Sequence, residues 1–320
     1  METKIVYVVV SSPIDIYLDQ TILSIKSLRH FHPEAVVELL LDSSTFETLR
    51  ENRGVIKDLV NEIHVISVPN ELSAKHKSSW LKTTMREHIV GDFLFVDSDT
   101  YINNPLSEVD DIEGVVCAVP DAHMCFSEHF QRIKYEVLFK KIGQTSPVDS
   151  NYNSGVLKVS DVPEAYSFFK IWHETWKANK EWCKYDQPFM AYADSKLHLI
   201  TEMSPFMNCQ VPYAVKFFKQ AKIVHYFASN FIFTTEKRPF KLMNKDFFVS
   251  LRAEDYDITD IISFGDIDDM FYNVRTEIMD GDIIDLCHSY QMKVLLEWYK
   301  RHKKMFQKIE KILGQLSISK

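Results

Sequence analysis

The chain has 320 residues, of which 46% are hydrophobic and 26% charged, and its formal net charge at pH 7 is -8. This composition allows one large domain with an extension, or two modest domains, and it excludes a disordered chain. The acidic balance argues against a general nucleic-acid binder. No apolar run approaches the roughly 20 residues that cross a bilayer, the N-terminus does not resemble a secretory signal, and the five cysteines include no C-x-x-C pair. We therefore expect a cytoplasmic protein.

The N-terminal third alternates between short strands and helices. Runs of apolar and often β-branched residues predict strands at residues 4–12, 35–44, 62–69 and 92–99. Apolar residues at helical spacing predict helices at residues 17–33, 46–54 and 78–90. Strands that are apolar on both faces and alternate with helices form mostly parallel sheets that are covered on each side. The sequence therefore predicts a doubly wound α/β fold.

Two aspartates follow the fourth predicted strand, in the stretch FLFVDSDTYI of residues 93–102. In doubly wound sheets ligands bind beyond the carboxyl ends of the strands, and residues two apart on a strand point to the same side. Asp97 and Asp99 can therefore converge on one point, where two carboxylates suit Mg²⁺ or Mn²⁺ bound together with substrate phosphates. Acid pairs of this spacing also occur in ordinary turns, so the motif alone leaves both interpretations open.

Further polar residues follow strands or turns downstream. Asn153 and Gly155 form a small turn in NYNSGVLKVS, and His225 ends the short apolar strand of AKIVHYF. Asp186 and Gln187 lie between them in YDQPF. Taken singly, each feature is more typical of structure than of function.

In this order, however, the blocks resemble family 8 glycosyltransferases, which include bacterial lipopolysaccharide galactosyl- and glucosyltransferases and glycogenin. The likeness covers about residues 3–240 and rests on IVYVVVSS…YLDQTILSIKSL, WLKTTMREHIVGDFLFVDSDTYI, YNSGVLKVS, DQPFMAYA and IVHYFAS. It implies the GT-A fold, a Rossmann-like arrangement with a mostly parallel central sheet flanked by helices. We predict this domain at residues 1–245 and a C-terminal helical extension at residues 246–320.

The resemblance implies roles in holding a metal and a nucleotide diphosphate. Asp97 and Asp99, with Ser98 between them, match the motif that binds Mn²⁺ (or Mg²⁺) and the nucleotide ribose, and His225 matches the third protein ligand of that metal. Basic residues at the matching positions would contact the donor sugar or its phosphates: Lys82, and Lys237 or Arg238. After the histidine the family continues with glycine and then Lys-Pro-Trp, whereas HYFASNFIFTTEKRPF has no glycine and reaches its proline later.

The resemblance also implies a site for the base of the nucleotide. Tyr17 would stack on the uracil, and Val10 and Ser11 would line the same pocket. Where the family places an acid or amide after the first strand, the stretch SSPID offers Ser11, Ser12 and Asp15.

On the sugar side, the resemblance implies that Asn153 and Gly155 cup the donor sugar. Asp186 and Gln187 match the acid and amide that face the anomeric carbon in retaining members. The implied catalytic residues are thus Gln187, Asp186 and Asn153.

The predicted function is metal-dependent transfer of a hexose from a UDP-sugar to a glycan or lipid-linked glycan acceptor, with retention. One alternative is a haloacid-dehalogenase-type phosphatase that uses Asp97 and Asp99, but in that group the pair lies on the first strand. Another alternative is a non-catalytic nucleotide- or glycan-binding relic of the fold. The intact Asp97, Asp99 and His225 argue against the relic.

The C-terminal tail has apolar residues at three- and four-residue steps with lysines between them, namely Leu295, Trp298, Met305, Ile309, Ile312 and Leu316. Such a helix can pack on the domain or pair with a second copy of the chain. It can also rest on an anionic membrane surface, which would make the enzyme peripheral at the inner membrane surface.

Overall fold

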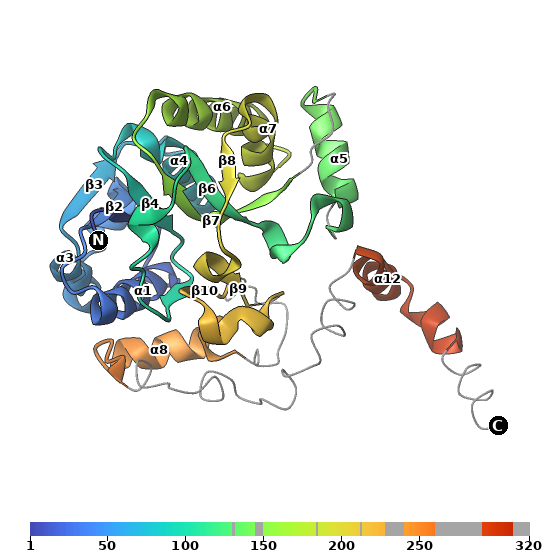
Figure 1. The fold of residues 1–320 in the computed structure, drawn as a ribbon. Coiled ribbons are helices and arrows are strands. Elements are labelled where there is room, and N and C mark those ends of the chain that lie inside the picture. Colours follow the sequence, from blue (N-terminus) through green and yellow to red (C-terminus); the bar gives the residue numbers. More distant parts are fainter. Residues whose placement is uncertain are drawn as a thin grey trace.

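The computed structural model describes residues 1–129, 132–144, 150–183, 185–211, 213–227, 240–259 and 290–309. Figure 1 shows a central sheet with helices on both sides. Its strand order within this described part is β3-β2-β1-β4-β7-β6-β8. The strands are β1 Lys4–Val9, β2 Val37–Asp42, β3 Glu62–Ile66, β4 Phe93–Val96, β6 Val116–Pro120, β7 Tyr152–Val159 and β8 Ile200–Glu202. Only β7 runs antiparallel to its neighbours in this sheet, so the predicted mostly parallel sheet is confirmed.

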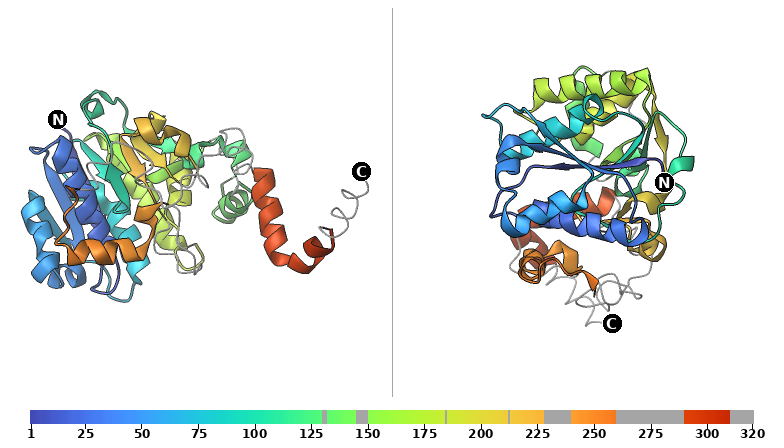
Figure 2. Two further views of the ribbon diagram at one scale, coloured as in Figure 1. Left: turned by 90° about the horizontal axis from the view of Figure 1, so that it is seen from below. Right: turned by 90° about the vertical axis from the view of Figure 1, so that its left-hand side faces the viewer.

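Helices cover the sheet in two layers, which the turned views of Figure 2 separate. The α-helices are α1 Tyr17–Phe31, α2 Ser43–Glu47, α3 Ile56–Leu59, α4 Ala74–Thr84, α5 Arg132–Lys141, α6 Pro163–Asn179, α7 Gln187–Leu197, α8 Lys245–Ala253 and α12 Tyr290–Arg301. Short 3₁₀ helices are η1 Glu51–Val55, η2 Met85–Glu87, η3 Val109–Asp111, η4 Asp121–His123, η5 Phe126–Glu128, η6 Pro205–Asn208, η7 Val215–Gln220 and η8 Lys241–Met243.

Alternate residues of each central strand enter two different cores. Tyr7 and Leu39 pack with residues of α1 and α8 on one face, whereas Val6 and Leu40 pack with residues of α4, α6 and α7 on the other. Because side chains alternate along a strand, a strand buried on both faces must be apolar at nearly every position. This explains the continuous apolar runs in the sequence.

The four predicted N-terminal strands are confirmed, but two helices begin earlier than predicted. The Asp42 side chain accepts a hydrogen bond from the Thr45 N–H and thereby begins α2 before residue 46. In the same way, Ser73 accepts a hydrogen bond from the His76 N–H, so α4 begins at Ala74 rather than at residue 78. The single helix predicted at residues 46–54 is wrong, because α2 ends at Glu47 and η1 begins only at Glu51, after the extended Arg50.

A small second sheet has the order β5-β10-β9, with β5 Thr100–Ile102, β9 Cys209–Gln210 and β10 Ile223–His225. The chain passes directly from β4 through Asp97 and Asp99 into β5. β5 then pairs with β10 so that Thr100 lies opposite His225. This pairing brings two distant parts of the sequence together at the carboxyl end of β4.

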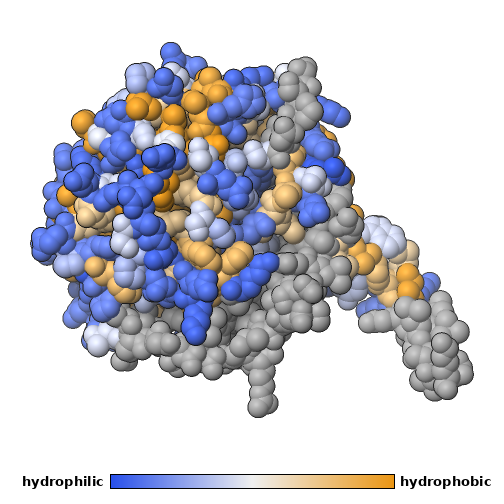
Figure 3. Space-filling view, in the orientation of Figure 1, coloured by the Kyte–Doolittle hydropathy of each residue, from blue (hydrophilic) through white to orange (hydrophobic). Residues whose placement is uncertain are grey.

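The residues after the predicted boundary at 245 divide into two parts. Phe248, Leu251 and Tyr256, in and after α8, lie in the same core as α1. In contrast, α12 lies outside the layers around the sheet (Figure 1), and apolar side chains show on its surface (Figure 3). Leu295, Trp298, Met305 and Ile309 are exposed rather than packed on the domain. None of the described helices is both long and apolar enough to cross a bilayer.

Candidate active site

The paired aspartates lie where the sequence predicts them, at the carboxyl end of a buried strand. Phe93–Val96 is fully buried, and the Asp97 N–H that follows donates to the Gly155 carbonyl oxygen at 2.7 Å. The side chains of Asp97 and Asp99 retain 26% and 22% of their exposure. The charges therefore sit at an open edge of the sheet rather than in the core.

Asp97, Asp99 and His225 form a group whose ligand atoms all lie within 4.8 Å of one another. His225 Nε2 is 3.3 Å from Asp99 Oδ1, and Lys82 Nζ is 2.9 Å from Asp97 Oδ1. Burial raises the pKa of Asp97 to about 6, Lys82 opposes this rise, and the charge of Asp99 adds to it. Although burial opposes ionisation of Asp99, the hydrogen bond and charge of His225 hold its pKa below the ordinary value. Two carboxylates thus share a small space that favours a cation.

A chain of hydrogen bonds fixes the orientation of His225. The Gly155 N–H donates to Asn153 Oδ1 at 3.0 Å, so Asn153 Nδ2 is the amide group that donates to Asp121 Oδ1, also at 3.0 Å. Asn208 Nδ2 donates to the same Asn153 Oδ1 at 2.9 Å. Asn208 Oδ1 therefore faces His225 Nδ1 at 3.1 Å, and this ring nitrogen must carry the proton. In a neutral ring, Nε2 is left with a lone pair directed to Asp99.

This arrangement fits a divalent cation. Without a metal, Asp99 is stabilised by the hydrogen bond and charge of His225. A divalent cation can take over this role, because the Nε2 lone pair of a deprotonated imidazole and the Asp99 carboxylate are both electron-pair donors. Gly155 leaves the required space, because a Cβ at this position would lie 2.3 Å from His225 Cε1 and 2.9 Å from Asp97 Oδ2. Two carboxylates and one imidazole suit Mn²⁺ or Mg²⁺ together with oxygen ligands from a substrate.

The predicted sugar-side residues lie next to this group. Ser154 joins them, because its N–H donates to Gln187 Oε1 at 3.3 Å and its hydroxyl donates to Asp186 Oδ2 at 3.2 Å. The Trp172 indole N–H donates to the Asp186 carbonyl oxygen at 3.0 Å and holds the start of α7. Asn153 and Gly155 flank Ser154 within the extended strand β7, so the turn predicted for them is wrong. On this strand they form one wall with Asp186 and Gln187, which we call the sugar wall.

Lys82 connects this wall to the metal group. Burial disfavours the charge of Lys82, but the charges of Asp97, Asp186 and Asp99 outweigh that cost and raise its pKa. The ammonium group is therefore charged at neutral pH, and it lies between the carboxylates of both groups.

The nucleotide-side residues meet at the end of β1. The Thr21 hydroxyl lies 2.9 Å from both Ser98 Oγ and the Tyr17 carbonyl oxygen, which brings the first turn of α1 next to the aspartate pair. The Tyr17 side chain is exposed. Ser11 is buried, and its hydroxyl donates to Asp15. Val10, which directly precedes it, is partly buried.

Asp15 has a structural role in this loop. Its Oδ1 accepts from Ser11 Oγ and the Tyr17 N–H, and its Oδ2 accepts from the N–H and hydroxyl of Ser12. Both carboxylate oxygens are saturated, so Asp15 is unsuited to read a base.

Two predicted residues, Lys237 and Arg238, lie outside the described residues. Conversely, the sequence did not identify Asn208 and Asp121, which complete the hydrogen-bond chain to His225. Asp121 follows β6 just as Asp97 follows β4, so the strand-end rule could have found it. Asn208 ends the short helix η6 and has no comparable signal.

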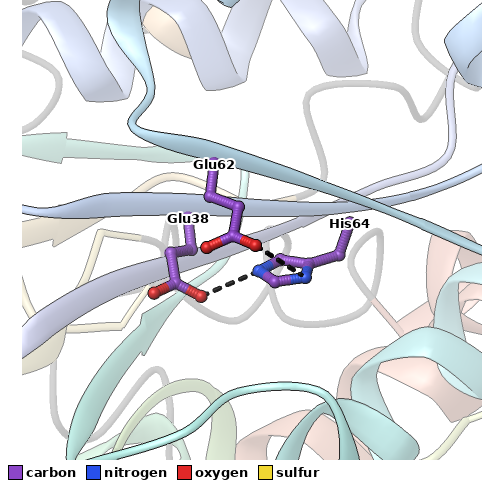
Figure 4. Close-up of side chains that lie close together, drawn as sticks. All are labelled: Glu38, Glu62 and His64. Atoms are coloured by element: carbon purple, nitrogen blue, oxygen red, sulfur yellow. Dashed lines mark hydrogen bonds and ion pairs between the residues drawn. The ribbon is translucent and has the colours of Figure 1, made fainter.

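A second group of the metal-binding type in the described part of the chain consists of Glu38, Glu62 and His64 (Figure 4). Glu38 is buried, and its two oxygens already pair with Lys4 Nζ at 2.6 Å and His64 Nε2 at 2.8 Å. Glu62 approaches the other ring nitrogen at 3.8 Å. Because Glu38 is satisfied by its neighbours, we assign this group a structural role.

Comparison with known proteins gives a fold but no sequence relative. Neither a protein-family model nor a curated protein sequence matches the chain. Among solved structures, the bifunctional glycosyltransferase WbbM is similar with a TM-score of 0.55 and 18% identity, over 79% of this chain and 51% of that one. The galactosyltransferase LgtC, in complex with donor and acceptor sugar analogues, is similar with a TM-score of 0.53 and 16% identity, over 79% of this chain and 96% of that one.

This chain has the GT-A glycosyltransferase fold. It spans about half the length of WbbM and nearly the whole of LgtC. An LgtC active-site mutant in which a glutamine is replaced by glutamate is similar with a TM-score of 0.50 and 15% identity, over 70% of this chain and 87% of that one. These neighbours confirm the GT-A fold that the sequence resemblance implies.

Proposed function

We propose that the protein is a metal-dependent glycosyltransferase that moves a hexose from a UDP-sugar to a glycan or lipid-linked glycan, with retention of the anomeric configuration. The observation that carries the proposal is the meeting of Asp97, Asp99, His225 and Lys82 at the strand edge of a GT-A fold. The donor and acceptor sugar analogues bound to LgtC support a sugar donor and a sugar acceptor for this fold.

Asp97, Asp99 and His225 would hold Mn²⁺ or Mg²⁺. When bound, the cation neutralises negative charge that develops on the departing diphosphate. Lys82 adds a second positive charge to the same region, and its contact with Asp97 keeps it in place before the donor binds. Tyr17 stacks on the base, and Ser98, between the two aspartates, is held near the start of α1 by the Thr21 hydroxyl.

Asn153 and Gly155 shape the pocket for the hexose, and Asp186 with Gln187 faces its anomeric carbon. As the bond from that carbon to phosphate breaks and the bond to the acceptor oxygen forms, the acceptor proton passes to the departing phosphate. The site residues offer no strong nucleophile of their own, which favours this front-face substitution. The LgtC mutant, whose replaced glutamine is described as an active-site residue, supports a role for Gln187.

The two alternatives predict different products. A haloacid-dehalogenase-type phosphatase would release inorganic phosphate, but it has no use for His225, Asn153 or Gln187. A non-catalytic relic would bind UDP without turnover. In this chain the three ligand positions and the sugar wall are all present, which favours catalysis.

The proposal is tested by incubating the protein with Mn²⁺ and UDP-glucose, UDP-galactose, UDP-N-acetylglucosamine or UDP-N-acetylgalactosamine. We expect slow release of UDP from one of these donors, and none after chelation of the metal. Release of inorganic phosphate instead of UDP supports the phosphatase, and UDP binding without release from any donor supports the relic.

We also propose that α12 attaches the enzyme to an anionic membrane surface. Its exposed apolar residues alternate with basic ones such as Lys300 and Arg301, which suits the boundary between lipid headgroups and acyl chains. The full chain should sediment with anionic liposomes, whereas the chain truncated at residue 288 should stay in the supernatant. Equal sedimentation of both forms, or dimerisation that requires α12 without liposome binding, would contradict this attachment.

A further inference from the structure

Three lysines and two exposed aromatic rings lie together beside Asp186, on the rim of the candidate active site. We call this group the lysine rim, and it consists of Lys75, Lys134, Lys141, Trp182 and Tyr185. The Trp182 and Tyr185 side chains are 41% and 45% exposed. The lysines come from α4 and α5, so the rim joins two helices and the segment that leads into α7.

Each of the three ammonium groups lies against an aromatic ring. Lys75 Nζ lies 4.0 Å and Lys134 Nζ 4.9 Å from the centroid of the Tyr185 ring. Lys141 Nζ lies 4.4 Å from the centroid of a ring of Trp182. A cation over a ring face is attracted to it, but the ring carries no charge that cancels the cation. Across the described residues, no salt bridge involves Lys134 or Lys141, whose contacts are these rings.

The rim is continuous with the sugar wall. Tyr185 directly precedes Asp186, and α5 packs against α7, which begins at Gln187. Lys75 and Lys82 are two helical turns apart on α4 and so share one face, which runs from the rim to Asp97. Helix α4 therefore links the rim to the donor side of the site.

From this arrangement we propose that the acceptor is an anionic saccharide, bearing a carboxylate or a phosphate, and that the lysine rim binds its negative group. This inference rests on the proposed function and adds the chemical class of the acceptor. The donor diphosphate is already matched by the metal group and Lys82, which leaves the charges of Lys134 and Lys141 for another ligand. The protein as a whole carries a net charge of -8 and repels anions, so an acidic acceptor needs a local positive surface to approach.

The test measures binding of saccharide probes to the full chain without donor, by calorimetry. Trigalacturonic acid is compared with neutral galactotriose, and mannose 6-phosphate with mannose, which separates a carboxylate from a phosphate ligand. We expect the acidic member of at least one pair to bind tighter, and its affinity to fall as salt rises. Each of Lys75→Gln, Lys134→Gln and Lys141→Gln should weaken that binding roughly two- to fivefold, and the triple variant more than tenfold.

Lys196→Gln is the matched control, because Lys196 Nζ lies 4.9 Å from the centroid of the Tyr192 ring, elsewhere on α7. It should leave saccharide binding unchanged. Equal binding of acidic and neutral probes, or unchanged binding in the triple variant, overturns the proposal.

A further experiment measures hydrolysis of the donor. Release of UDP in the absence of acceptor should be the same in the triple variant as in the native chain. If the triple variant loses this release instead, the lysines serve the donor and the proposal is wrong. If the native chain releases no UDP from any donor, the proposed function fails, which is a distinct result.

Discussion

Gly155 lies on β7 directly against the group formed by Asp97, Asp99 and His225. A Cβ there would lie 2.3 Å from His225 Cε1 and 2.9 Å from Asp97 Oδ2, so Gly155→Ala must displace a ligand. We expect this variant to lose Mn²⁺ binding in a calorimetric titration and to lose about 1–3 kcal/mol of unfolding free energy. Gly54→Ala is the control, because its Cβ would meet only the Leu49 carbonyl oxygen at an ordinary 3.7 Å. Normal metal binding by Gly155→Ala would show that His225 is not a ligand.

Asn208 acts on metal binding indirectly, through its hydrogen bond with His225. It is fully buried, and its Oδ1 accepts a hydrogen bond from the His225 Nδ1–H, which leaves Nε2 free to bind a metal. We expect Asn208→Ala to weaken Mn²⁺ binding roughly 10- to 100-fold, the effect usual for the partner of a metal-binding histidine. Binding is measured by electron paramagnetic resonance of free Mn²⁺, and thermal unfolding checks the fold. Asn179→Ala, which removes a helix-surface amide, is the control. Unchanged Mn²⁺ affinity in Asn208→Ala would refute the positioning role.

Among the helices, α8 is joined to α1 by a buried ion pair. Asp19 is fully buried, its Oδ1 accepts from Arg252 Nε at 3.1 Å and from the Tyr256 hydroxyl at 2.6 Å, and its Oδ2 pairs with Arg252. Arg252→Met leaves this carboxylate without its cation, so we expect a loss of about 1–3 kcal/mol in urea unfolding. Breaking the exposed Lys300–Glu297 pair with Lys300→Gln should cost less than about 1 kcal/mol. Equal effects of the two substitutions would mean that α8 is not part of the first domain.

The start of α2 gives a pH-dependent prediction. Burial opposes ionisation of Asp42, but hydrogen bonds from Ser44, Thr45 and Lys77 hold its pKa below the ordinary value. The folded state therefore favours the ionised form, and this stabilisation is present above about pH 4 and is lost as pH falls through the folded pKa.

We expect Asp42→Asn to be less stable than the native chain by about 1–2 kcal/mol at pH 7. The difference should shrink near pH 3, as measured by urea unfolding at both pH values. Asp58→Asn, at an exposed position of α3, is the control. A difference that stays constant with pH would contradict the role of the Asp42 charge.

At the scale of the whole molecule, the strand-end rule made much of the site predictable. Asp97, Asp99 and His225 follow recognisable apolar runs, and in the structure they converge. The small second sheet could not be predicted from the sequence, because strands of two or three residues carry no periodic signal. Asn208 was missed for a related reason, since its role depends on the meeting of η6 with β10 and β7, which only the tertiary structure provides. Asp15 is of a residue type that could contact a base, but hydrogen bonds within its own loop occupy both of its carboxylate oxygens.

The most direct test of the proposed metal-dependent nucleotide site is a calorimetric titration of UDP into the protein with and without Mn²⁺. We predict that the native chain binds UDP tightly only with the metal, that Asp99→Ala abolishes this dependence, and that His225→Ala weakens binding while the fold remains intact. Glu62→Gln removes an exposed carboxylate from the Glu38–Glu62–His64 group and should leave UDP binding unchanged. Metal-independent UDP binding, or full Mn²⁺-dependent binding by Asp99→Ala, would show that Asp97, Asp99 and His225 do not form a metal-dependent nucleotide site.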